Sequence, residues 1–65
     1  MEEYKAAITD YTIAITLDPN DSETYIVRGD TQQNLGQTNN ACLDWIKAEE
    51  LGNKEASERI KKYCK

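Results

Sequence analysis

The chain repeats itself at a spacing of 34 residues. When the sequence is aligned with itself at that offset, small residues meet small ones and aromatic residues meet aromatic ones. The matching pairs are Ala7 and Ala41, Asp10 and Asp44, Tyr11 and Trp45, Ala14 and Ala48, and Leu17 and Leu51. A fixed period of about 20 to 50 residues indicates structural units that stack and bury a core between neighbours.

Within each unit the apolar residues recur at helical spacing. From Tyr4 to Ile15 they fall three or four residues apart, which is the pattern of one face of an α-helix. Pro19 ends that helix, Asp21 or Ser22 can cap the next one, and glycines end the following two. The sequence therefore predicts helices over residues 2–17, 22–35, 39–51 and 54–64.

Composition narrows the classes of function. The chain has 65 residues and a net charge of −4 without a basic block, which argues against nucleic acid as a partner. It has no long apolar run, so we expect no membrane span. Its N-terminus does not resemble a signal peptide, which favours a cytoplasmic location but leaves an exported parent protein open. It lacks histidine, a phosphate-binding glycine loop and a nucleophile constellation, so we expect no catalysis, metal or cofactor.

Three motifs resemble the tetratricopeptide repeat. Ala7-x3-Tyr11-x2-Ala14-x4-Pro19 is similar to the second helix of such a repeat, Tyr25-x2-Arg28-Gly29-x2-Gln32 to the first helix of the next, and Ala41-x3-Trp45-x2-Ala48 to its second helix. The resemblance implies an all-α fold of antiparallel hairpins stacked as a short solenoid. Residues 1–65 would form one domain, with a second helix at 2–17, a full repeat at 22–52 and a capping helix at 54–64.

The chain departs from that family pattern in two ways. Arg28 and Gln32 stand where leucine and tyrosine are usual, so we expect residues 22–35 to form the least stable helix. The chain also begins with a second helix, whose partner helix would precede it. The uncovered apolar face then predicts a homodimer through residues of the first helix, namely Tyr4, Ile8, Ile13 and Ile15.

The resemblance also implies a function. First helices of this family line a groove that receives a peptide or a partner helix, and the groove-facing residues here would be Glu23, Ile26, Asp30, Gln33 and Asn34. The leading hypothesis is a non-catalytic interaction scaffold whose acidic groove favours a basic or neutral protein partner. The alternative is a structural fragment that self-associates or closes an array of helices.

Five other residues could either carry chemistry or serve the fold. An antiparallel hairpin about Gly52 brings Cys42 near Cys64, which predicts either a disulfide or two buried thiols. Asp10 and Asp44 are paired carboxylates only in sequence, and we expect them to be solvated or capping groups. Trp45 is expected in the core because it matches Tyr11.

Overall fold

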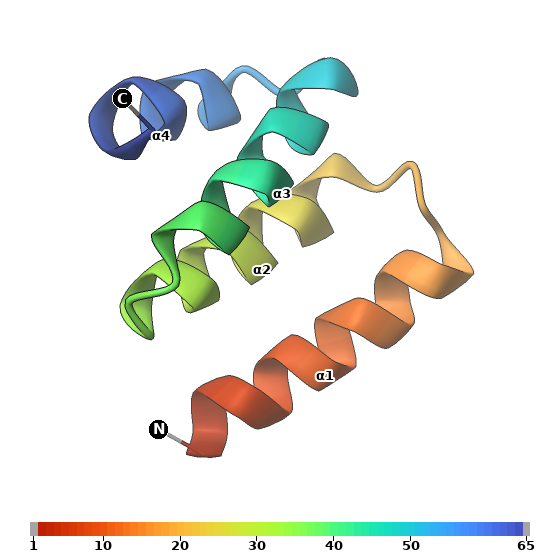
Figure 1. Ribbon diagram of the computed structural model, residues 1–65. Helices are drawn as coiled ribbons and strands as arrows, with labels where there is room; N and C mark the ends of the chain where they lie inside the picture. The colour runs from red at the N-terminus through yellow and green to blue at the C-terminus, as the bar shows by residue number, and fades with distance from the viewer. Residues whose placement is uncertain (1, 65) are drawn as a thin grey trace.

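The computed structural model describes residues 2–64, and it confirms an all-α chain with four helices. They are α1 (Glu2–Leu17), α2 (Ser22–Asn34), α3 (Thr38–Glu50) and α4 (Glu55–Tyr63). Figure 1 shows α1, α2 and α3 side by side, with α2 running opposite to both neighbours. The fourth helix, α4, packs against α3 on the side away from α1.

Local signals in the sequence set the helix ends. The carboxylate of Asp21 caps α2 by accepting hydrogen bonds from the Glu23 backbone N–H at 3.2 Å and the Thr24 hydroxyl at 3.0 Å. Gly36 and Gly52 follow α2 and α3 with φ angles of 77° and 95°. Only glycine adopts this left-handed conformation freely, so each helix ends where the sequence predicts.

The core lies between α2, α3 and α4. Its buried apolar residues are Tyr25 and Ile26 of α2, Ala41, Trp45 and Ala48 of α3, and Ala56 of α4. Helix α2 is therefore flanked on both sides, although the sequence suggested that it would be the least stable helix. Arg28 forms an ion pair across to α3, whereas the buried Oε1 atom of Gln32 accepts no hydrogen bond from the described residues.

Helix α1 is the peripheral element, and none of its described residues is buried. Its side chains Ile8 and Ile15 are half-buried, and Ile15 packs against the core. Tyr4 and Ile13, in contrast, remain 39% and 55% exposed. The residues predicted for self-association are thus divided between the half-buried and the exposed parts of α1.

Candidate functional site

Two adjoining hollows lie between α2 and α4. The larger, of about 300 Å³, is bounded by Asp30, Gln33 and Asn34 of α2 and by Glu58, Lys62 and Tyr63 of α4. The smaller, of about 140 Å³, is bounded by Glu23, Ile26, Val27 and Asp30 of α2 and by Glu55 of α4, and Arg59 borders both. The structure therefore brings together all five residues that the sequence analysis assigned to a groove.

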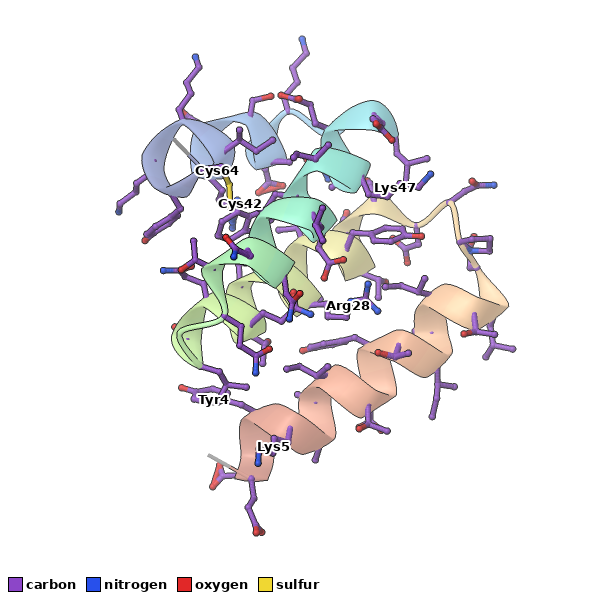
Figure 2. All side chains as sticks on the ribbon, in the orientation of Figure 1. Tyr4, Lys5, Arg28, Cys42, Lys47 and Cys64 are labelled. Atoms are coloured by element: carbon purple, nitrogen blue, oxygen red, sulfur yellow. A yellow bond between two sulfur atoms is a disulfide. The ribbon has the colours of Figure 1, made fainter. Side chains whose placement is uncertain are left out.

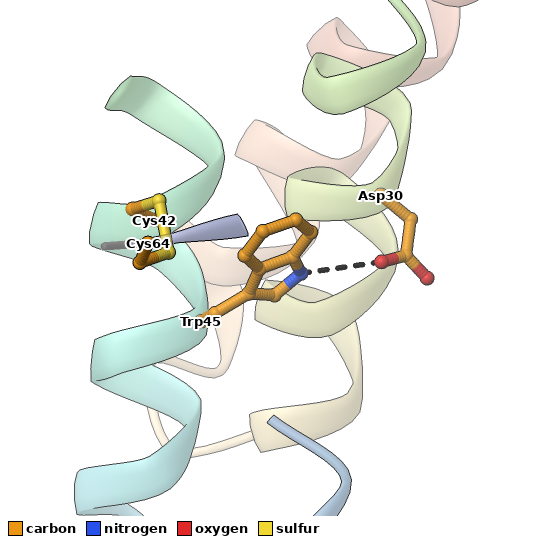
Figure 3. The surroundings of a disulfide bond; sticks show 4 residues. All are labelled: Asp30, Cys42, Trp45 and Cys64. Atoms are coloured by element: carbon orange, nitrogen blue, oxygen red, sulfur yellow. Dashed lines mark hydrogen bonds between the residues drawn. A yellow bond between two sulfur atoms is a disulfide. The ribbon is translucent and has the colours of Figure 1, made fainter. Parts of the chain in front are cut away.

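Asp30 holds the boundary between the two hollows. Its carboxylate accepts a hydrogen bond from Trp45 Nε1 at 3.2 Å, and it accepts two from Arg59, at 2.6 Å from Nε and 3.0 Å from Nη2. The hydrogen bond with Asp30 raises the pKa of Arg59, against the lowering effect of desolvation. The guanidinium stays charged, and α2, α3 and α4 meet at this one carboxylate (Figure 3 shows its bond with Trp45).

Gln33 borders the larger hollow, but its side-chain carbonyl is buried. Its Oε1 atom is buried and accepts no hydrogen bond from the described part of the chain. The Oε1 atom of the neighbouring Gln32 is also buried without a donor among the described residues, and a buried carbonyl in this state costs about 1–3 kcal/mol. Ile26 borders the smaller hollow, but it is only 5% exposed and belongs mainly to the core.

A disulfide fixes the α4 side of the hollows. Cys42 of α3 is bonded to Cys64, directly after α4, with the two Cα atoms 5.8 Å apart. The structure thus contains the bonded alternative and not two buried thiols. Trp45 lies between this bond and Asp30 (Figure 3), and its ring centroid is 5.5 Å from that of Tyr63. The bond therefore holds the end of α4 beside the wall of the larger hollow.

A second ion pair joins α2 to α3, and its arginine also contacts α1. Arg28 of α2, labelled in Figure 2, donates to both carboxylate oxygens of Asp44 of α3, at 2.8 and 2.7 Å, and to the Thr12 hydroxyl of α1 at 3.2 Å. The hydrogen bond with Asp44 raises the pKa of Arg28, although burial lowers it. The expectation that Asp44 is solvated or capping is wrong, since the residue is 6% exposed. Asp10 is exposed as expected, and Trp45 is buried as expected.

Sequence reasoning missed both ion pairs for a physical reason. Arg28 and Asp44 are 16 residues apart and Asp30 and Arg59 are 29 apart, so neither pair has a local spacing that would mark it. The signal that the sequence did contain for such pairs was the placement of oppositely charged residues among the apolar positions of the predicted helices.

No protein-family model, curated protein or solved structure matches this chain. Across residues 2–64, no helix is long and apolar enough to cross a bilayer. The same residues contain no group of three acidic or cysteine side chains arranged to hold a metal ion.

Proposed function

We propose that the chain is a non-catalytic protein-interaction module of tetratricopeptide type, which receives a peptide in the hollows between α2 and α4. The observation that carries this proposal is the convergence of Glu23, Ile26, Asp30, Gln33 and Asn34 on those two hollows. The 34-residue repetition and the alternating directions of α1, α2 and α3 support the family assignment.

The chemistry of the hollows indicates a basic or neutral peptide. Glu23 and Glu55 border the smaller hollow, while the charge of Asp30 is already matched by Arg59. The combined volume suits a few side chains, so we expect affinity in the range of weak, transient complexes.

Peptide selection followed by mapping tests the proposal. A library of short random peptides is selected against the immobilised chain, and the enriched peptides are titrated into isotope-labelled protein. We expect the backbone resonances of Asp30, Gln33 and Glu58 to move with each enriched peptide. Selection without enrichment, or shifts confined to other surfaces, would contradict the proposal.

A matched pair of variants controls for non-specific binding. Asn34→Arg places a long cation at the border of the larger hollow, and Asn39→Arg makes the same change on exposed α3 surface away from it. Only Asn34→Arg should weaken the binding of a basic peptide. Equal weakening by both variants would point to a general charge effect.

The second candidate function is a structural piece that self-associates through α1. It is favoured by the large apolar side chains that α1 leaves in solvent, above all Leu17 at 81% and Ile13 at 55% exposed. Sedimentation equilibrium distinguishes the two functions. A stable mass of two chains favours the structural role, and a mass of one chain favours the interaction module.

A further inference from the structure

The nine residues of α4 are attached to the rest of the chain by different means at the two ends. At the first end, Asn53 accepts a hydrogen bond from the backbone of α4 at 3.0 Å and donates one to the Ser22 hydroxyl at 3.1 Å. Ala56, in the first turn, is buried. At the second end, the Cys42–Cys64 disulfide follows directly after the helix. Loss of the disulfide would therefore leave the first end attached.

The disulfide is the main restraint on residues 58–64. Arg59 pairs with Asp30, but the two side chains are 30% and 40% exposed, and ion pairs this open to solvent are weak. Ile60 is only partly buried against the core. A helix of nine residues is also shorter than the length of about 12–15 residues that is marginal for an isolated helix in water. We therefore expect this half of α4 to stay against α3 only while the disulfide is intact.

The same half of α4 forms one wall of the larger hollow. The residues that α4 contributes to that hollow all lie between 58 and 63, namely Glu58, Arg59, Lys62 and Tyr63. The smaller hollow, in contrast, also receives Glu55 from the end of α4 that Asn53 holds. Trp45 borders the larger hollow and lies beside the disulfide (Figure 3). Release of the second half of α4 would thus remove a wall from the larger hollow and leave most of the smaller one.

The chemistry of release requires a dithiol reductant. Cys42 and Cys64 are half-buried and not enclosed, so a thiol can approach the bond from solvent. One thiolate of the reductant attacks a sulfur atom, which forms a mixed disulfide and frees one cysteine as a thiol. The second thiol of the reductant then displaces the other cysteine. The reductant supplies two electrons and two protons and leaves as a disulfide.

We propose that the Cys42–Cys64 disulfide is a redox switch for the larger hollow. The oxidised chain holds the wall in place and binds peptide there, and the reduced chain releases the wall while α2, α3 and the smaller hollow persist. The effect on peptide binding rests on the proposed function, whereas release of the wall does not.

The first experiment follows the wall without any peptide. NMR spectra of the isotope-labelled chain are recorded with and without a small dithiol. On reduction, the Arg59 Nε–H and the amides of Lys62 and Tyr63 should move to the positions of an unfolded chain, while the amides of Ile26 and Ala48 keep theirs. Unchanged resonances of Lys62 and Tyr63 would overturn the proposal. So would simultaneous loss of α2 and α3, since reduction would then unfold the chain and not open one hollow.

The second experiment measures peptide affinity, with peptides enriched on the oxidised chain as the probe. Affinity for a peptide that shifts Lys62 should fall about tenfold on reduction, as expected if the wall stays in place in about one tenth of the reduced molecules. The doubly substituted chain, Cys42→Ser with Cys64→Ser, should bind like the reduced chain and ignore the dithiol. Leu43→Ser, an exposed change beside Cys42 that retains the disulfide, should behave like the original chain.

Linkage provides a reciprocal measurement. A peptide that prefers the oxidised chain must protect the disulfide by the same factor, so saturating peptide should raise about tenfold the ratio of dithiol to its disulfide that reduces half of the chains. Counting of free thiols at equilibrium gives this ratio. Equal affinity of the two forms, with no protection, overturns the switch and leaves the proposed function intact. If no peptide is enriched on the oxidised chain, the proposed function fails, and the resonances of Lys62 and Tyr63 alone decide whether the wall is released.

Discussion

Asp10 and Asp44 occupy equivalent positions in the repeated sequence, but their surroundings differ. Asp44 is nearly buried and receives two hydrogen bonds from Arg28, whose side chain is itself 19% exposed, whereas Asp10 is in solvent. We predict that Asp44→Asn lowers the free energy of unfolding by about 2 kcal/mol, because it leaves a half-buried guanidinium without its counter-charge. Urea denaturation followed by circular dichroism measures the change.

Asp10→Asn is the natural control for that variant. It makes the same chemical change on an exposed helix surface, where substitutions usually alter stability by less than about 0.5 kcal/mol. Equal losses for the two variants would mean that the Arg28 pair contributes nothing beyond an ordinary surface charge.

Gly29 is a point of close approach between α2 and α3. A Cβ atom at this position would lie 2.6 Å from Trp45 Nε1, 2.8 Å from Trp45 Cδ1 and 3.2 Å from the Ala41 carbonyl oxygen. We predict that Gly29→Ala destabilises the chain by about 1–3 kcal/mol through overpacking. This is opposite in sign to the gain of about 1 kcal/mol that alanine normally brings to a helix interior.

A double-mutant cycle with Trp45→Phe isolates that steric cause. The smaller ring should relieve the clash, so Gly29→Ala should cost less in the Trp45→Phe background than in the original chain. A cost independent of the residue at position 45 would place the strain elsewhere.

At the level of elements, the short helix α4 depends on its covalent link. It contributes a single buried residue, Ala56, and the Cys42–Cys64 bond closes a loop with a sequence separation of 22. Replacing both cysteines by serine should lower the free energy of unfolding by about 3 kcal/mol according to the chain-entropy account. Denaturation of the two proteins, each with and without a dithiol reductant, measures the loss.

The reductant supplies the control within that experiment. It should destabilise the original chain and leave the doubly substituted chain unaffected, because the latter has no bond to reduce. On reduction, we expect the NMR resonances of α4 to lose their dispersion before those of α2. Unchanged stability of the reduced chain would show that packing alone holds α4.

The elements themselves were predictable from the sequence. Helix ends lie within about one residue of their expected positions, because the signals at Pro19, Asp21, Gly36 and Gly52 act on their immediate neighbours. The ion pairs of Asp30 and Asp44 were not predictable. Each joins residues far apart in the sequence, and whether they meet depends on how the helices cross. Five residues of α2 that border the hollows were anticipated only through the resemblance, and Ile26 among them is also largely buried. The residues that α4 contributes to the hollows were not anticipated.

At the level of the whole molecule, stability is unevenly distributed. The buried apolar residues belong to α2, α3 and α4, and none of the described residues of α1 is buried. We predict that the amides of α1 exchange with solvent through local opening at lower free energy than those of α2 and α3. Native-state hydrogen exchange measured by NMR gives these values, and uniform protection across the three helices would contradict the prediction.

Trp45 is the sole tryptophan of the chain and is 1% exposed. It contacts the backbone of α2, donates to Asp30 and lies beside Tyr63, while the disulfide is nearby. Its fluorescence emission therefore reports from one known location on which three helices converge. Disulfide bonds quench indole fluorescence at short range, so reduction of the bond should increase the emission intensity of Trp45. Water that enters beside the ring should shift the emission maximum to longer wavelength. The intrinsic fluorescence of Trp45 can therefore report on both the disulfide and the packing of the core without an added label.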